Sequence, residues 1–254
     1  MRAPWKSSGT RMRLGGVLLR SFTLQGSWNY RTMLGGGFAF AILPVLRRLH
    51  QGDPEGLQKA VRRHCEHFNA HPYLSGVALG AVVRMEAEGV DPEQIRRFKT
   101  AVRGPLGGLG DTLVWAGGLP ALLLVALAFV ILDAPAWMAP LGFLGGYNLG
   151  HLALRLWGFR VGFRNGPSVG TRLRDTDLRK WGGRIQALGI VALGSVLALL
   201  FLSSGPAGGI AVWWAAPAGA LFVLGVFRGR ELWRLAGVVF TFVLVGFFVL
   251  GAMT

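Results

Sequence analysis

Charged residues are scarce in this sequence, and long stretches have none. Only 15% of the 254 residues are charged, whereas an ordinary soluble domain has about 25%. Charge is absent from residues 185–227 and from 235–254, and residues 104–154 contain only Asp111 and Asp133. Apolar windows of about 20 residues span a hydrocarbon layer roughly 30 Å thick. The distribution therefore excludes an ordinary soluble domain and favours a polytopic, all-α membrane protein.

Cysteine and acidic residues are also rare. The single cysteine, Cys65, excludes an internal disulfide. The chain has 12 acidic residues against 27 Lys and Arg, which gives a net charge of +15. The basic residues lie in the gaps between apolar segments, as in the cytoplasmic loops of inner-membrane proteins. They are not interleaved with aromatic residues in a nucleic-acid-binding motif, so we expect no nucleic-acid partner. The basic N-terminus lacks a compact apolar run with a cleavage site, which argues against a cleaved signal peptide.

The long apolar segments predict about five transmembrane helices. Each is close to the length that crosses a bilayer. The predicted spans are residues 113–132, 136–157, 185–203, 208–227 and 235–253.

The loops between these spans predict their orientation. The loops 155–184 and 228–234 are rich in Arg and should be cytoplasmic. The links 133–135 and 203–209 have no Lys or Arg and should face outward. We therefore expect a multi-pass protein of the bacterial inner membrane, with residues 47–110 and the N-terminus in the cytoplasm and the C-terminus outside.

Three regions follow from this pattern. Residues 1–20 are a basic cytoplasmic lead-in, residues 21–112 contain amphipathic and re-entrant helices, and residues 113–254 form the transmembrane region. Within the middle region, Asp-Pro-Glu occurs at 53–55 and again at 91–93. Asp can cap a helix and Pro is tolerated in its first turn, so both sites should start helices.

Two glycine-rich segments of the middle region predict irregular membrane elements. Residues 34–46, LGGGFAFAILPVL, are apolar but too short to span, and fit an interfacial or re-entrant piece. The segment 103–112, RGPLGGLGDT, predicts a broken backbone that leads into the first span. Asp111 lies near the end of this segment. It is either a functional ionisable group at membrane depth or the N-cap of the next helix.

Residues 63–72, RHCEHFNAHP, hold three of the five histidines. On a helix, His64, His67 and His71 would lie within about 60° of one another. Pro72 disfavours helical geometry at the preceding residue, and the HExxH pattern of zinc enzymes is absent. We therefore favour the end of a helix at the membrane surface over a metal site.

Glycines at positions 142, 146 and 150 share one face of the second predicted span. Small residues at this spacing allow close helix–helix approach, and ordinary packing is the simplest interpretation.

The segment 24–33, LQGSWNYRTM, mixes polar amides with aromatic rings. Hydrogen-bonding groups beside a flat ring suit sugar recognition, and the same composition is typical of an interfacial aromatic anchor.

Five segments together resemble subunit IID of the mannose/fructose/sorbose-type sugar phosphotransferase system. They are RSFTLQGSWNYRTM, GFAFAILPVLRRL, RRHCEHFNAHPYLSGVALG, RGPLGGLGDTLVW and LRLWGFRVGFRNG, and they follow the family's order and spacing. In the family pattern the positions of Cys65 and His67 are apolar or aromatic, which agrees with the absence of a metal site.

The resemblance implies a membrane subunit that pairs with subunit IIC, and together they move a hexose or related sugar. The cytoplasmic IIA and IIB components carry the phosphoryl histidines, so IID should be a non-catalytic subunit without cofactor. The family also implies re-entrant elements and a trimer of IIC–IID protomers. The substrate-binding candidates are Gln25, Asn29, Arg31, Asn69, His71, Gly110 and Asp111.

The sequence departs from the family at two notable positions. Arg31 stands where the family has Glu, and Leu119 precedes Pro120 where the family tends to have Arg. A carboxylate accepts hydrogen bonds from sugar hydroxyls, whereas a guanidinium only donates. The alternative to a transport subunit is thus a non-transporting paralogue that anchors or regulates phosphotransferase proteins. A metal-dependent membrane enzyme is the third hypothesis, and it rests on the histidines alone.

Overall fold

The computed structural model describes residues 14–203. The predicted spans 208–227 and 235–253 lie outside these residues, as does the loop 228–234. Within the described part the chain is helical, and its only β-type pairings are two isolated bridges at Met33. The expected all-α class is therefore confirmed for residues 14–203, while the number of membrane spans stays a prediction.

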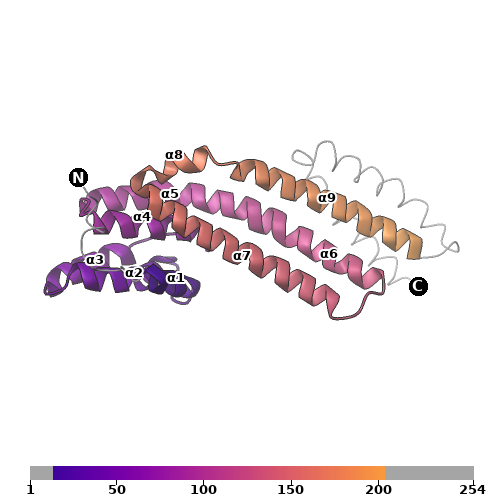
Figure 1. Cartoon of the computed structure of the whole chain (residues 1–254), viewed down its shortest axis with the longest axis horizontal. Helices are drawn as coiled ribbons and strands as arrows, with labels where there is room; N and C mark the ends of the chain where they lie inside the picture. The colour runs from indigo at the N-terminus through magenta and orange to yellow at the C-terminus, as the bar shows by residue number, and fades with distance from the viewer. Residues whose placement is uncertain (1–13, 204–254) are drawn as a thin grey trace. The chain divides into compact units, whose positions relative to one another are not determined.

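The chain divides into two compact units. The first comprises residues 1–111 and 150–177, and the second comprises 112–149 and 178–254. The chain passes from one unit to the other within α7 (Met138–Asn165). Each unit is described here by itself (Figure 1).

The first unit consists of short helices and contains all the candidate site residues. Its helices are α1 (Leu14–Arg20), α2 (Gly35–Leu49), α3 (Pro54–Cys65), α4 (Ser75–Ala87), α5 (Pro92–Gly110), the C-terminal part of α7 and α8 (Val169–Arg174), with 3-10 turns at Ser21–Thr23 and Gly166–Ser168. The two Asp-Pro-Glu segments start helices as predicted. The Asp53 carboxylate accepts from the Gly56 amide at 2.8 Å, and the Asp91 carboxylate accepts from the amides of Glu93 and Gln94 at 3.0 and 3.1 Å.

Helix α2 is longer and more deeply packed than the apolar segment 34–46 suggested. It continues through Pro44 to Leu49, and its inner face is buried in the first unit. Pro44 has no amide hydrogen for the carbonyl of Phe40, four residues earlier. The Arg20 guanidinium donates to that carbonyl at 3.4 Å and lies 4.7 Å from the Phe40 ring centroid. The non-local contact supplies the donor that proline removes, while re-entry into the membrane stays a prediction.

Helices α4 and α7 meet through glycines at positions that sequence analysis did not select. The backbones of Gly80 on α4 and Gly162 on α7 each lie against the other helix. An added β-carbon at Gly80 would overlap the Phe159 carbonyl, and one at Gly162 would overlap the Val77 carbonyl. Gly76 and Gly158 extend the same close approach by one helical turn. Close approach of these helices thus uses glycines four residues apart on each helix. They are Gly76 and Gly80 on α4 and Gly158 and Gly162 on α7.

Gly142, Gly146 and Gly150, the glycines whose spacing suggested close packing, make looser contacts than the four glycines above. A β-carbon at Gly142 would lie 3.3 Å from the Phe129 ring and one at Gly146 would lie 2.8 Å from a Leu122 methyl, whereas Gly150 has nothing within 4 Å. These contacts are to flexible side chains rather than to backbone.

The segment 103–112 is helical, and the prediction of a broken backbone there is wrong. Helix α5 includes Pro105 and runs on into a π-helical segment, Asp111–Gly118, and then α6 (Leu119–Ile131). Asp111 has helical dihedrals and its amide donates to the carbonyls of Gly107 and Gly108, so it does not start a new helix. Each glycine disfavours a helix by only about 1 kcal/mol, and among the glycines of this segment only Gly110 is tightly packed. A π segment is rare and frequently occurs at functional sites.

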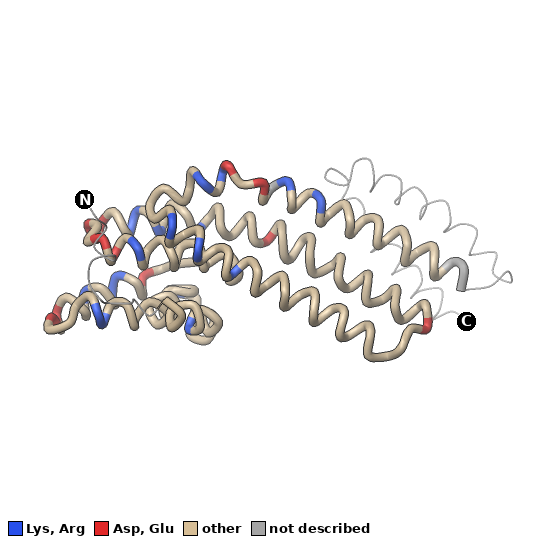
Figure 2. Tube along the Cα trace, viewed as in Figure 1, with Lys and Arg blue, Asp and Glu red and all other residues tan. Residues whose placement is uncertain are grey.

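The described residues of the second unit are largely apolar, apart from the start of the last described helix. Helix α6 and helix α9 (Leu178–Ser203) pack along each other, with Gly117 against the Ile185 side chain and Gly182 against the Thr112 methyl. Figure 2 shows blue and red gathered on the helices of the first unit and long tan stretches on α6 and on the later part of α9. Two described helices are long and apolar enough to cross a membrane, Pro92–Ile131 and Lys180–Leu200.

Candidate functional site

Two loops that carry four of the candidate residues are paired through their backbones. The amide of Leu34 donates to the carbonyl of Phe68 at 2.9 Å, and the amide of Phe68 donates to the carbonyl of Thr32 at 3.2 Å. The loop 24–34 is thereby held against residues 66–70. This pairing brings Asn69 next to the segment that contains Gln25, Asn29 and Arg31.

Asn29 shapes its own loop. Its side-chain oxygen accepts from the amides of Arg31 and Thr32 at 3.1 and 2.9 Å, and its Nδ2 donates to the Ser27 carbonyl and the Thr32 hydroxyl at 3.2 and 2.8 Å. The loop then closes at Met33, whose φ of 53° lies in the left-handed region. Because its amide already makes four hydrogen bonds, Asn29 positions the loop rather than offering a vacant group to a sugar.

Gln25, Arg31 and Asn69 are exposed. None of the ion pairs in residues 14–203 involves Arg31, so it does not pair with Asp111 or another described acid. The side chain instead reaches solvent, which avoids the cost of an unpaired cation at membrane depth.

His71 and Gly110 are in direct contact. The His71 side chain is only 3% exposed, and a β-carbon added at Gly110 would overlap its Cβ and Cγ atoms. Asp111 follows Gly110 as the first residue of the π-helical segment, and it is exposed. Burial lowers the pKa of His71, and the Asp111 carboxylate opposes that shift. The structure therefore brings together three candidates, His71, Gly110 and Asp111, that are about 40 residues apart in the sequence.

Three residues beside His71 were not among the sequence candidates. The rings of Tyr73 and His151 stack with their centroids 3.8 Å apart and their planes 12° from parallel. His71 meets Tyr73 edge-on at 5.0 Å. The Arg155 Nε donates to the His151 Nε2 at 2.9 Å. Tyr73, His151 and Arg155 thus extend the His71 contact into a polar aromatic cluster.

Arg155 is a buried cation, 2% exposed, and forms no ion pair with an acid in the described part of the chain. Its guanidinium donates to the Ser21 carbonyl and, at 3.0 Å, to the Ser21 hydroxyl, and lies 4.7 Å from the Phe22 ring centroid. A buried charge is costly unless such partners compensate for it. In the sequence, Arg155 stands at the start of the predicted basic loop 155–184. Its position at the end of a predicted apolar span was the signal that could have identified it.

The first unit also contains a buried ionic network at the end of α3. Glu86 accepts from Arg63 at 2.6 Å and from the His64 Nε2 at 2.7 Å. Burial lowers the pKa of His64 to about 4, so the imidazole is neutral at neutral pH. Burial alone would raise the pKa of Glu86, but the hydrogen bonds from His64 and Arg63 outweigh it and lower that pKa. Lys99 donates to the carbonyls of Arg63 and His64 at 3.2 and 3.4 Å, and so satisfies the end of α3.

The three clustered histidines therefore serve different contacts. His64 bonds to Glu86, His67 accepts from the Arg103 guanidinium at 2.9 Å, and His71 packs on Gly110. Helix α3 ends at Cys65, so the helical spacing that would align the histidines does not extend past it. Residues 14–203 contain no group of three or more His, Cys, Asp or Glu arranged to hold a metal ion.

Long apolar helices in residues 14–203, with a polar and aromatic cluster in the first unit, are typical of a helical membrane protein. Its family follows from comparison with known sequences. The PTS system mannose/fructose/sorbose family IID component matches residues 10–202. This chain belongs to that family of sugar-transport subunits of the phosphotransferase system, as its motifs indicated.

Relatives with related names support the same assignment. The chain is 33% identical over 193 residues to the mannose-specific EIID component of Escherichia coli K12. The alignment covers 74% of this chain and 68% of that protein. It is 30% identical over 190 residues to the sorbose-specific EIID component of Klebsiella pneumoniae, covering 73% and 68%. It is 26% identical to the fructose permease IID component of Bacillus subtilis, covering 74% and 69%.

Two solved structures share the fold. A cryo-EM structure described as the mannose transporter ManYZ in complex with microcin E492 aligns with a TM-score of 0.58 and 27% identity, covering 97% of this chain and 96% of that one. A second structure, described only as a membrane protein, aligns with a TM-score of 0.68 and 26% identity, covering 94% of both chains.

Proposed function

We propose that this chain is the IID subunit of a mannose-type sugar transporter, which forms the uptake channel with a IIC subunit. The sugar is phosphorylated as it enters, by the cytoplasmic IIA and IIB components. Family membership over residues 10–202 supports this proposal, as does the likeness to a chain of a mannose transporter complex. By the same family argument, IIC–IID protomers assemble as trimers in the bacterial inner membrane.

The observation that carries a sugar-binding role for this subunit is the contact of His71 with Gly110, beside Asp111. An imidazole and a carboxylate together offer a donor and acceptors for sugar hydroxyls. The stacked Tyr73 and His151 rings add the aromatic surface that sugar binding uses. Asp111 is exposed and begins the π-helical segment, so its carboxylate charge lies beside the His71–Gly110 contact.

The loop residues complete the proposed sugar contacts. Gln25, Arg31 and Asn69 are exposed on the paired loops and can reach a ligand, while Asn29 fixes the loop shape. None of these residues is proposed as catalytic, because the phosphoryl group is carried by the cytoplasmic components. The chain therefore binds and conducts sugar without a cofactor of its own.

Asp111→Asn tests the proposed site in membranes that contain the IIC partner. If Asp111 lines the sugar path, sugar binding weakens by about 1.5–3 kcal/mol, the usual range for a hydrogen bond to a charged group, or roughly 10-fold to 150-fold in Kd. Asp133→Asn is the matched control, because Asp133 lies in the short link after α6. Equal sugar affinity in the Asp111 variant and the unmodified complex would remove Asp111 from the site.

The second candidate function is a non-transporting paralogue, and Arg31 is the residue that favours it. An exposed cation stands where the family has a carboxylate, so a sugar hydroxyl loses an acceptor. Uptake of labelled hexoses by cells that express this chain with IIC, IIA and IIB separates the two functions. Phosphorylated sugar inside the cells supports the transporter. Stable co-purification with those proteins, without any uptake, supports the paralogue.

A further inference from the structure

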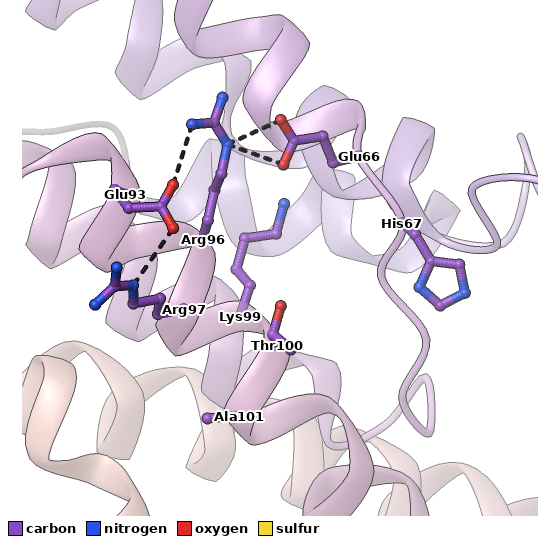
Figure 3. Close-up of a pocket in the computed structure, with 8 residues that line it drawn as sticks. All are labelled: Glu66, His67, Glu93, Arg96, Arg97, Lys99, Thr100 and Ala101. Carbon is purple, nitrogen blue, oxygen red and sulfur yellow. Dashed lines mark hydrogen bonds and ion pairs between the residues drawn. The ribbon is translucent and has the colours of Figure 1, made fainter.

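The first unit has a cavity on the side of α5 that faces the end of α3. Its volume is about 460 Å³, within the range of small-molecule sites. Figure 3 shows the cavity and the residues around it. The lining consists of charged and polar side chains: Glu66, His67, Glu93, Arg96, Arg97, Lys99 and Thr100, with Ala101. This cavity is separate from the His71 contact and has no part in the sugar site proposed above.

Both carboxylates of the cavity are already paired with arginines. The Arg96 Nε donates to the two Glu66 oxygens at 3.0 and 3.2 Å. The other acid, Glu93, is held by Arg96 at 3.5 Å and by Arg97 at 3.4 Å. These pairs hold the acids on one side of the cavity, as the dashed lines in Figure 3 show. The acids are therefore engaged, and the donors on the other side face the space.

The opposite side of the cavity is built from hydrogen-bond donors. Lys99 is buried, and its ammonium donates to two α3 carbonyls and lies 5.0 Å from the Phe38 ring centroid, so it adds positive charge to this side. The exposed Thr100 adds a hydroxyl. Arg103 can only donate, so the His67 Nδ1 accepts and the ring proton is on Nε2. Figure 3 shows Lys99 and Thr100 between Arg96 and His67.

The charge of the cavity suits an anion. Three cations, Arg96, Arg97 and Lys99, line it together with two carboxylates, which leaves one net positive charge. Arg103, bonded to His67, adds a second. A phosphate monoester carries about −1.5 to −2 charges at pH 7 and offers three strong acceptor oxygens. Its charge and its acceptors both match this lining.

The distance from the apolar part of the chain favours a ligand from water over a lipid. Lys99 and Asp111 lie on one continuous helix, 12 residues apart, which corresponds to about 18 Å. Even at the largest usual helix tilt, roughly 40°, about 14 Å of this remains along the bilayer normal. A headgroup layer is only about 5–7 Å thick. If the hydrocarbon begins near Asp111, the cavity lies beyond the headgroups.

We propose that this cavity is a phosphate-monoester site that takes a phosphorylated small molecule from the cytoplasm. The Thr100 hydroxyl and the His67 Nε2 bind the phosphate oxygens, while Lys99, Arg97 and Arg103 neutralise its charge. The choice of a hexose phosphate as the ligand rests on the proposed function, in which such a molecule is the product of uptake. The site would then sense the product on the side where it is released.

Calorimetric titration of the full-length protein in neutral-lipid nanodiscs tests the site with three probes: hexose 6-phosphate, inorganic phosphate and the unphosphorylated hexose. Saturable binding of hexose 6-phosphate and none of the free hexose at this site is the expected result. Equal affinity for inorganic phosphate would show that the site takes the phosphate alone, and would overturn the sugar part of the proposal. Abolition of binding by anionic lipid in the nanodisc would identify a headgroup site and overturn the proposal.

Variants locate the binding in the cavity. Arg97 and Thr100 are exposed, so Arg97→Gln and Thr100→Val should fold. Each should raise the Kd for hexose 6-phosphate at least 10-fold. Arg48→Gln removes the same charge from the exposed end of α2 and should leave that Kd unchanged. An equal loss in Arg48→Gln, or unchanged binding in both cavity variants, would refute the site.

Sugar uptake by the same variants separates this proposal from the proposed function. Normal uptake with no hexose-phosphate binding to the unmodified protein would refute the cavity site and leave the transport role intact. Binding that depends on Arg97 and Thr100 in a chain that supports no uptake would retain the site and refute the transport role.

Discussion

Gly110 is the residue on which the His71 contact depends. Its hydrogen leaves room for the His71 ring, and any β-carbon would displace that buried ring. Gly110→Ala is expected to destabilise the protein by about 1–3 kcal/mol, as overpacking typically does, and to weaken sugar binding as His71 moves. Gly107→Ala is the matched control on the same helix, because Gly107 has no neighbour within 4 Å. Thermal unfolding in detergent measures the difference, and equal melting temperatures for the two variants would contradict the packing argument.

Arg31 is the largest chemical departure from the family in the proposed sugar region. Because it is exposed and forms no ion pair in the described part of the chain, Arg31→Glu should fold normally. The new carboxylate can accept hydrogen bonds from sugar hydroxyls. We predict tighter binding of neutral hexoses and weaker binding of anionic sugars by the IIC-paired variant. Binding titrations with both kinds of sugar check this, and unchanged affinity for both would show that Arg31 does not affect specificity.

At the scale of elements, the junction of α3, α4 and α5 predicts loss of stability in acid. Folded His64, with its pKa lowered to about 4, stays neutral where an unfolded histidine with pKa 6.5 binds a proton. Stability should therefore fall as the pH drops from about 6.5 to 4, by up to about 1.4 kcal/mol per pH unit. The lowered pKa of Glu86 changes stability in the same direction, because the stabilisation by the Glu86 carboxylate is lost as pH falls through its folded-state pKa.

His64→Gln removes the histidine contribution, so its unfolding free energy should depend less steeply on pH in that window. His50→Gln is the control, because His50 lies at the partly exposed end of α2. Denaturant unfolding at several pH values measures the slopes. A slope that His64→Gln leaves unchanged would show that other groups cause the acid sensitivity.

The contact between α4 and α7 predicts a second effect at this scale. Gly162→Ala forces a methyl group into the Val77 carbonyl, and backbone cannot move aside as a side chain can. We expect a loss of about 1–3 kcal/mol. Gly145→Ala on the same helix has open space around it, and should be neutral or stabilising by up to about 1 kcal/mol. Equal changes in melting temperature for the two variants would argue against the glycine contact.

At the scale of the whole molecule, the basic loop and the uncharged link predict opposite sides of the membrane. A reporter fused at Thr176 should be cytoplasmic, since Arg residues surround it. One fused after Ser204, just beyond the described residues, should be external because that link has no Lys or Arg. Fusions to alkaline phosphatase and to a cytoplasmic fluorescent protein give complementary signals. Two fusions that report the same side would refute the predicted spans.

Local signals in the sequence determined the helical class, the starts of two helices and the family. Caps at Asp53 and Asp91 act within three residues, and the apolar runs need no distant partner, so both could be recognised from the chain alone. The order and spacing of the motifs were likewise properties of the sequence. The paired positions of His71 and Gly110 were both selected as candidates, although their contact was not.

Only the tertiary structure decided which residues meet. It assigned Glu86 to His64, Arg103 to His67 and the His151 ring to Tyr73, each across distances in sequence that periodicity does not encode. It also decided that residues 103–112 stay helical. Glycine and proline set local preferences of a few kcal/mol at most, and hydrogen bonding and packing along a long helix can override them. The sequence thus fixes what each segment can form, and the packing of distant segments selects the contacts that make a site.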